Sequence, residues 1–398
     1  MNQPRQNFSI NVLLEILLVS TKLGLTSFGG PIAHLGYFHE EYVRRRKWMD
    51  EKSYSDLVAL CQFLPGPASS QVGIGIGVMR AGVIGGILAF IGFTLPSVLA
   101  LIIFALLLHN LGFQDFGWIH GLKIVAVVVV AHAILGMAKN LTPDLQRKTI
   151  ALGALVLTLL WQTAFTQIAV ILIAGVVGYL LYRQQTIDDQ STGAHFPISR
   201  RFGYICLALF FGLLIFLPIV TEATAWNWLA MFDSFYRSGS LVFGGGHVVL
   251  PLLEREFVPT GWLTEEQFLA GYGATQAVPG PLFTFAAYIG AVIWGWQGGL
   301  LATFAIFLPA FLLILGTLPF WENLRRNTKV KGALMGVNAG VVGILIAALY
   351  HPIWTSSILS TVDFVFAAFL FSMLVFWKLP PWVIVLTGAI GGFLLSLI

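Results

Sequence analysis

The sequence predicts an all-α, polytopic membrane protein, built as an inverted-topology repeat with broken or re-entrant helices. Three observations support this prediction: an apolar composition, long segments without charge, and short motifs that recur at a nearly constant distance. Of the 398 residues, 57% are hydrophobic and only 10% are charged, whereas soluble domains carry about 25% charged residues. The net charge of +4 requires no nucleic acid as a partner, since basic loops facing the cytoplasm give the same balance.

Apolar segments long enough to cross a bilayer, which takes about 20 residues, are spread along the whole chain. Residues 82–108 and 295–319 contain no charged residue, and each has a proline near its middle, Pro96 and Pro309. Because proline removes a helical hydrogen bond, we expect a kinked helix in each. Further helices are expected at 118–138, 149–161, 165–182, 202–220, 332–350, 362–377 and 382–398.

Motifs of the first part of the chain recur in the second part at offsets of 213 to 215 residues. Phe-Gly-Gly at 28–30 corresponds to Phe-Gly-Gly at 243–245, and Pro-Gly-Pro at 65–67 corresponds to Pro-Gly-Pro at 279–281. Between these two motifs the first part has the segment "WMDEKSY", and the second part has the similar segment "WLTEEQF" at the corresponding place. We therefore expect a first repeat at 1–182, a polar linker with one extra transmembrane helix at 183–225, and a second repeat at 226–398.

The basic residues of the loops indicate that the second repeat has the opposite orientation. Residues 39–52 carry five Lys or Arg and the matching 253–266 carry one, whereas 109–123 carry one and the matching 321–331 carry four. Because basic loops stay in the cytoplasm, this alternation predicts an inverted repeat, an arrangement typical of secondary transporters. It also places the N-terminus and the linker 183–201 in the cytoplasm.

Glycine and proline interrupt each repeat twice, at the Phe-Gly-Gly and Pro-Gly-Pro motifs. Irregular backbone inside a membrane is tolerated only where it is buried or lines a polar cavity, and a half-helix that begins after a break turns free N–H groups toward it. We expect the breaks to form one anion site near the middle of the membrane; the alternative is that they only permit close helix packing. The expected substrate-binding residues, with the neighbouring polar side chains, are Thr26, Ser27, Phe28, Gly29, Gly30, Gln62, Pro65, Gly66, Pro67, Ser69, Ser70 and Gln71 in the first repeat, and Phe243, Gly244, Gly245, Gly246, Gln276, Pro279, Gly280 and Pro281 in the second.

Two cations occupy equivalent positions, six residues before each Phe-Gly-Gly motif. They are Lys22 and Arg237. A charge at the centre of a membrane helix costs about 2.5–3.5 kcal/mol on insertion scales, so we expect this pair to attract the bound anion. Two alternatives stay open: snorkelling of the side chains to the interface, and ion pairing with Glu15 and Asp233.

Titratable side chains follow the glycine breaks in both repeats. His34 and His247 are candidates for proton coupling, because histidine titrates near neutrality, and Glu40, Glu41 and Glu254 are further candidates. The alternative for the histidines is an orienting hydrogen bond, and for the glutamates an ion pair with a neighbouring arginine.

The sequence predicts neither an enzyme nor a cofactor. Cys61 and Cys206 are too few for a cysteine metal site. There is no Walker motif for ATP and no Gly-x-Ser-x-Gly elbow for a serine nucleophile, and the eight histidines are scattered. These absences favour a carrier or a channel over a membrane enzyme.

The segments "KLGLTSFGGPIAHLGYF", "RRRKWMDEKSYSDLVALCQFLPGPASSQVGIGIG", "SLVFGGGHVVLPLLE" and "GYGATQAVPGPLFTFAAYIGA" resemble the chromate ion transporter family in its long two-domain form. The resemblance covers both halves of the chain. It implies a secondary transporter of the bacterial inner membrane that exports chromate, is linked to the proton motive force and confers chromate resistance. It further implies that sulfate, a close structural analogue, interferes, and that Lys22, the Phe-Gly-Gly and Pro-Gly-Pro motifs, Glu41, Trp48 and Gln62 are functional positions.

Charge alone makes a tetrahedral dianion a suitable substrate for export. Moving one charge through 100 mV is worth about 2.3 kcal/mol, so a dianion leaving a negative interior gains roughly twice that amount. The alternatives are a carrier for sulfate or another oxyanion, and an anion channel. The expected partners are chromate, with sulfate as a competitor, and the lipid bilayer; a homodimer stays open as the oligomeric state.

Overall fold

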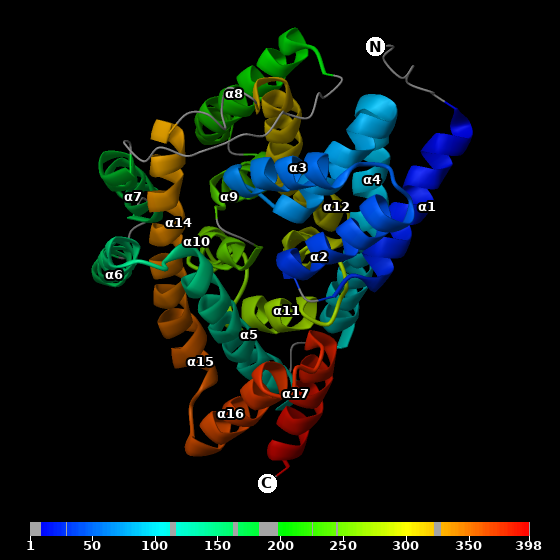
Figure 1. Cartoon of the computed structure of the whole chain (residues 1–398). Helices are drawn as coiled ribbons and strands as arrows, with labels where there is room; N and C mark the ends of the chain where they lie inside the picture. The colour runs from blue at the N-terminus through cyan, green and yellow to red at the C-terminus, as the bar shows by residue number, and fades with distance from the viewer. Residues whose placement is uncertain are drawn as a thin grey trace.

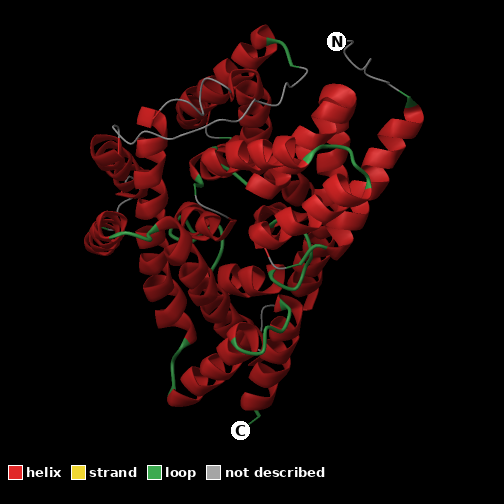
Figure 2. Cartoon of the chain, viewed as in Figure 1, coloured by secondary structure: helices red, strands yellow, loops and turns green. Residues whose placement is uncertain are grey.

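In a computed structural model, the protein is described over residues 9–28, 30–111, 117–161, 166–182, 198–224, 226–243, 246–321 and 328–397. Every regular element in these ranges is helical (Figure 2), so the all-α prediction is confirmed. Five of the described helices are long and apolar enough to cross a membrane. The chain is a multi-pass membrane protein, as its composition indicates.

The first half of the described chain contains seven α-helices and one π-helical turn. They are α1 (Ile10–Thr26), α2 (Gly30–Phe38), η1 (His39–Arg45), α3 (Glu51–Phe63), α4 (Ala68–Leu111), α5 (Gly117–Leu141), α6 (Leu145–Leu160) and α7 (Thr166–Tyr182). Helix α8 (Arg200–Thr224) follows and exposes most of its surface. It is the extra helix that the sequence predicts between the two halves.

The second half repeats this order of elements in its described residues. They are α9 (Asn227–Leu241), η2 (Gly246–Val248), α10 (Val249–Phe257), α11 (Glu265–Thr275), η3 (Leu282–Thr284), α12 (Phe285–Thr317), η4 (Leu318–Phe320), α14 (Thr328–Ala348), η5 (Leu349–Trp354), α15 (Thr355–Ser357), α16 (Thr361–Val375) and α17 (Pro381–Leu395). Helices therefore end or begin at both Phe-Gly-Gly and both Pro-Gly-Pro motifs, as the sequence predicts.

The two longest helices, α4 and α12, are each kinked at one glycine. Gly82 and Gly295 both have φ of 63°, a left-handed conformation that glycine adopts without steric cost. They are 213 residues apart in the sequence. The helical stretches after the kinks therefore begin where the sequence predicts spanning segments, and Pro96 and Pro309 lie inside those stretches.

Each half packs one of its long helices against the last helices of the other half. Helix α5 of the first half packs along α17, and the corresponding helix of the second half, α14, packs along α7. In Figure 1, α14 runs beside α7, and α5 extends toward α16 and α17. A contact in which each half offers the same surface to the other is what a two-fold relation produces.

Small residues form these exchanged contacts. At Gly121 a side chain would overlap the backbone of Gly388, and at Gly178 it would overlap the backbone of Gly336. Such close approach is the common way in which helices associate inside lipid, where no hydrophobic force drives them together. The outer faces of α4, α8, α12 and α17 carry large exposed apolar side chains, among them Ile103, Phe216, Phe304 and Ile390.

The two halves differ in how the helix before the Pro-Gly-Pro motif is covered. Helix α11 packs along α5 and is buried from Phe268 to Thr275. Among the described residues, the corresponding helix α3 packs on α4 and makes no extensive contact with α14. Figure 1 shows α11 lying across the middle of the molecule below α2, whereas α3 lies at its upper side. Helix α11 of the second half is therefore buried more completely than helix α3 of the first half.

Candidate functional site

The breaks of the two halves are tied together by a reciprocal pair of backbone hydrogen bonds. The N–H of Gly66 donates to the carbonyl of Val242 at 2.7 Å, and the N–H of Gly280 donates to the carbonyl of Ser27 at 2.9 Å. Each Pro-Gly-Pro motif thus contacts the residue at the Phe-Gly-Gly break of the other half. The four breaks are therefore joined in two pairs, each between the halves, and the anion site expected from them stays a prediction.

The glycine of each Pro-Gly-Pro motif has a backbone conformation that other residues adopt only with strain. Gly66 has φ of +111° and Gly280 has φ of +101°, and L-residues with a side chain rarely occupy this region. A side chain at Gly280 would also overlap the Ser97 hydroxyl, while one at Gly66 would approach Ala310 at 3.3 Å. Ser97 and Ala310 correspond at an offset of 213 residues, so the same close approach recurs in both halves.

A cavity of about 480 Å³ lies where these breaks converge. Its wall contains Ser27, Phe28 and Gly30 from the first half, and Gln276 and Gly280 from the second. We call this space the anion cavity. The remainder of its wall comes from α2, α5, η2, the end of α11 with the turn after it, the start of η3, and the end of α16 with the turn to α17: Tyr37, Val129, His132, His247, Thr275, Val278, Leu282, Leu374, Val375, Lys378, Leu379, Pro380 and Pro381.

Buried polar atoms without a hydrogen-bond partner among the described residues gather at the breaks. They include the hydroxyls of Ser27 and Ser70 and the amide nitrogen of Gln276. A buried donor without a partner costs about 1–3 kcal/mol, so each such group in a folded protein calls for an explanation. Ser27 and Gln276 line the anion cavity, and together they offer hydroxyl and amide donors to an oxyanion.

Lys378 supplies the positive charge of the anion cavity. Among the described residues of that wall it is the one Lys or Arg, and none of them is Asp or Glu. Its backbone is left-handed, with φ of 54°, in the turn between α16 and α17. The sequence analysis did not select Lys378. The pair "WK" at 377–378 corresponds to "WQ" at 161–162 at an offset of 216, and this match could have marked Lys378 as part of the internal repeat.

The two cations expected at the site, Lys22 and Arg237, form matching ion pairs instead of lining the anion cavity. Lys22 Nζ lies 3.1 Å from Glu41 Oε2, and Arg237 Nη1 lies 2.7 Å from Glu256 Oε1. Arg237 also contacts Asp233 at 2.9 Å. This arrangement favours the alternative of ion pairing, with Asp233 as the sequence suggested for Arg237, but with Glu41 rather than Glu15 for Lys22.

Glu15 of α1 belongs to the same network of ion pairs as Lys22 and Glu41, because Arg46 contacts both glutamates. It pairs with Arg46 at 2.8 Å and with Arg80 at 3.1 Å. Arg80 in turn lies over the Trp48 ring, 4.6 Å from its centroid. Among the described residues, the basic residues of 39–52 are therefore partly neutralised by acids of the first half.

The two histidines after the glycine breaks each make one contact with a hydroxyl group. His34 Nδ1 lies 3.4 Å from Ser69 Oγ, and His247 Nδ1 lies 2.7 Å from Tyr272 Oη. His34 is buried, whereas His247 reaches the anion cavity. These contacts favour the orienting hydrogen bond that the sequence left open for both.

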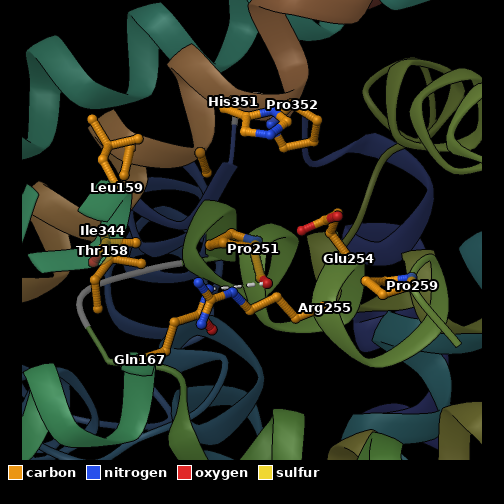
Figure 3. A pocket seen from close by; sticks show the side chains of 12 residues that line it. Thr158, Leu159, Gln167, Pro251, Glu254, Arg255, Pro259, Ile344, His351 and Pro352 are labelled. Atoms are coloured by element: carbon orange, nitrogen blue, oxygen red, sulfur yellow. Dashed lines mark hydrogen bonds between the residues drawn. The ribbon is translucent and has the colours of Figure 1, made fainter. Parts of the chain in front are cut away.

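The three glutamates proposed for proton coupling have different surroundings. Glu40 is exposed and lies 3.5 Å from Arg44. Glu41 is buried; burial favours its neutral form, but hydrogen bonds from Arg46 and Lys22 outweigh this effect and lower the pKa of its carboxyl. Glu254 lines a second cavity, shown in Figure 3, and has no ion pair among the described residues.

The remaining predicted site residues lie around the breaks without lining the anion cavity. Thr26 donates back to the carbonyl of Lys22, and Gln71 donates to the carbonyl of Pro65. Gln62 is exposed, and Gly246 contacts Leu282 of the other break in the second half. Gly29, Gly244 and Gly245 fall outside the described residues. Pro65, Pro67, Pro279, Pro281, Ser69 and Phe243 belong to the breaks or flank them.

Comparison with known proteins places the chain in a family. The profile of the chromate transporter family matches residues 14–179 and again residues 229–393. The chain belongs to the chromate transporter family. The two matches coincide with the two halves that exchange the hydrogen bonds of Gly66 and Gly280. Among the described residues of this chromate transporter family member, no cluster of three His, Cys, Asp or Glu could hold a metal ion.

Several relatives are similar to the chain over most of its length. A chromate transport protein of Pseudomonas aeruginosa is 27% identical over 332 residues, which is 81% of this chain and 77% of the relative. A probable chromate transport protein of Synechococcus elongatus is 29% identical, over 86% of this chain and 84% of the relative. An uncharacterized transporter of Methanocaldococcus jannaschii is 28% identical, over 84% and 83%. No solved structure matches this member of the chromate transporter family.

Proposed function

We propose that the protein is a secondary transporter that exports chromate from the cytoplasm across the inner membrane of a bacterial cell and thereby confers chromate resistance. Membership of the chromate transporter family supports this substrate, as do the names of two relatives, a chromate transport protein and a probable chromate transport protein. The observation that carries the proposal is the anion cavity, where breaks of both halves meet and where the described wall residues include one lysine and no acid.

The substrate is proposed to bind with its oxygens facing donors from both halves. Ser27 and Gln276 offer a hydroxyl and an amide that have no partner among the described residues, and Lys378 offers a charge. Hydrogen bonds to a charged group are worth about 1.5–3 kcal/mol each. Gly30, Gly280 and the adjoining prolines act by shaping the backbone of the wall, while Lys22 and Arg237 hold the helices of the two halves in place through Glu41 and Glu256.

The proposed orientation follows from the loop charges. The N-terminus and the linker 183–201 lie in the cytoplasm, and residues 1–182 and 226–398 are repeats inserted in opposite directions. The reciprocal bonds of Gly66 and Gly280 support a two-fold relation, and the reversed loop charges support an axis in the membrane plane. Such an arrangement places the substrate site near the middle of the membrane, between the repeats.

The membrane potential favours export of a dianion. Each charge gains about 2.3 kcal/mol per 100 mV when a negative ion leaves a negative interior. Export therefore proceeds with the potential, and coupling to an entering proton would add to the driving force. The direction proposed for this chain is consistent with that sign.

The experiment that tests this function is chromate uptake into everted membrane vesicles that contain the protein. We expect saturable uptake that an interior-positive potential accelerates and that sulfate inhibits less strongly than unlabelled chromate. Uptake of sulfate with no uptake of chromate would identify a sulfate carrier instead. Flux that rises linearly with chromate concentration and ignores an imposed pH gradient would identify an anion channel.

A further inference from the structure

Resting on the proposed function, we propose that the protein has a proton-binding site separate from the anion cavity, with the Glu254 carboxylate as the group that takes up the proton and His351 as its neighbour on the entry path. The site would take a proton from water, and chromate would not enter it. We call this space the Glu254 cavity and define it by the residues around Glu254 in Figure 3.

The Glu254 cavity has a volume of about 390 Å³ and lies between four parts of the fold. Its wall comes from the end of α6, the start of α7, α10 with the turn after it, and the junction of α14 with η5. In Figure 3 the Glu254 carboxylate is directed into this space, and His351 lies above it in the view. The side chain therefore meets a space large enough for water rather than a packed wall.

Glu254 and Glu256, two residues apart on α10, have different surroundings. Glu254 accepts no hydrogen bond and forms no ion pair within 4.0 Å among the described residues, whereas Glu256 is held by Arg237 at 2.7 Å. Glu40 of the first half, which also follows a glycine break, is an exposed acid beside Arg44. The two acids therefore differ in their surroundings: Glu40 is solvated, whereas Glu254 faces a cavity.

The charges around Glu254 leave its proton affinity high. The charged or titratable groups nearest to it are Arg255 on the same helix, Glu265 at the start of α11, and His351 on η5. Arg255 is engaged in an interaction of its own. Helix α10 is not one of the spanning helices. Burial raises the pKa of Glu254 to about 7; the charge of Arg255 acts in the opposite direction, and that of Glu265 adds to the rise.

The position of the Glu254 cavity suits proton entry from the side opposite the cytoplasm. The turn at 258–264, which follows α10 beside this cavity, contains no Lys or Arg, so the loop-charge rule assigns it to that side. His247, which lines the anion cavity, lies seven residues before Glu254, in the η2 turn that leads directly into α10. The short segment formed by η2 and α10 thus reaches both cavities. Through it, a change in the charge of Glu254 is expected to affect the position of His247.

The test uses the full chain, purified and reconstituted in proteoliposomes, as wild type, Glu254→Gln and the matched control Glu40→Gln. Chromate flux and proton movement are measured together, the latter with a pH-sensitive dye. Wild type and Glu40→Gln should show proton movement with chromate, and a rate that changes roughly tenfold per pH unit on one side of the midpoint. Glu254→Gln should lose both the proton movement and the pH dependence.

An infrared titration of the carboxyl band tests the site without any transport. A band that titrates near pH 7 should be present in wild type and in Glu40→Gln and absent in Glu254→Gln. Its absence from wild type, or its persistence in Glu254→Gln, would overturn the proposal. Chromate flux in Glu254→Gln with unchanged proton movement would overturn it as well. Failure of wild type to move chromate while the band titrates would contradict the proposed function alone.

Discussion

The two halves of this molecule keep the same backbone geometry while their side chains differ in use. In both, a glycine with positive φ donates to the break of the other half, and a cation pairs with the glutamate 19 residues later. At neighbouring positions the halves diverge: Glu40 is a surface acid, whereas Glu254 faces a cavity. The comparison teaches that the repeat specifies a common scaffold, while the surroundings of similar side chains differ between its two halves.

A second difference concerns the carbonyl before each strained glycine. The carbonyl of Pro279 accepts a hydrogen bond from Ser97 of the first half at 2.6 Å. Ala310, the residue that corresponds to Ser97, has no hydroxyl, and Gln71 donates to the carbonyl of Pro65 at 2.9 Å from within the same half. The carbonyl of Pro279 is therefore held by the other half, while the carbonyl of Pro65 is held from within its own half.

The largest effect is expected from alanine at the two strained glycines. Gly280→Ala forces a side chain into a left-handed conformation, which costs roughly 1–2 kcal/mol, and into the Ser97 hydroxyl. We expect loss of chromate transport and a lower melting temperature. Gly66→Ala has the same strain but meets the flexible end of Gln71 at 3.2 Å, so it should be milder. Equal losses would show that the two breaks do not differ in how they are held.

Next in size is the removal of the cation from the anion cavity. Lys378→Gln should raise the chromate concentration for half-maximal uptake by roughly tenfold or more, because a charge-assisted hydrogen bond of about 1.5–3 kcal/mol is lost. Lys378→Arg should restore most of the affinity. The matched control is Lys139→Gln, on an exposed position of α5 outside the cavity wall. Unchanged uptake by Lys378→Gln would remove Lys378 from the site.

The corresponding ion pairs should differ in strength, because Arg237 is less exposed than Lys22. The side-chain exposure is 29% for Arg237 and 50% for Lys22. Arg237→Gln leaves Glu256 and the buried Asp233 without their partner, so its melting temperature should fall more than that of Lys22→Gln. Removing one member of a buried pair costs about 3–5 kcal/mol, while exposed pairs contribute about 0–1 kcal/mol. Thermal unfolding in detergent would measure both, and the opposite order would refute this account.

The smallest effect is expected at the residues that distinguish the two carbonyls. Ser97→Ala removes one hydrogen bond to Pro279, worth about 0.5–1.5 kcal/mol, and should lower the melting temperature slightly. Ala310→Ser, the reverse change at the corresponding position, should have no such cost if its hydroxyl reaches the carbonyl of Pro65. A large loss in Ala310→Ser would indicate that the close approach to Gly66 tolerates no added atom.

Much of the fold could be predicted because it depends on local sequence. Hydropathy locates the spanning helices, since lipid accepts only apolar helices with satisfied backbones. The helices end at both glycine motifs because glycine and proline disfavour helix within a few residues of themselves. Even the kinks at Gly82 and Gly295 coincide with the starts of the predicted spanning segments. The two family matches follow the same internal repeat.

The assignment of charges could not be predicted in this way. Lys22 and Arg237 were recognised as symmetric cations, yet their roles depend on Glu41 and Glu256, which approach them only after α2 and α10 fold back. Lys378 is distant in sequence from every break, and only the packing of the turn between α16 and α17 brings it to the anion cavity.

The sequence by itself determined the membrane class of this protein, its helices, its four breaks and the pairing of its two halves, because hydropathy, backbone strain and repeat offsets are properties of short segments. The tertiary structure decided which polar groups share a cavity and which neutralise one another. Electrostatic energy depends on distances of a few ångströms between side chains, and those distances arise only when segments far apart in the chain meet. Glu40 and Glu254 both follow a glycine break, and the surrounding helices make one a surface acid and the other a proposed proton site.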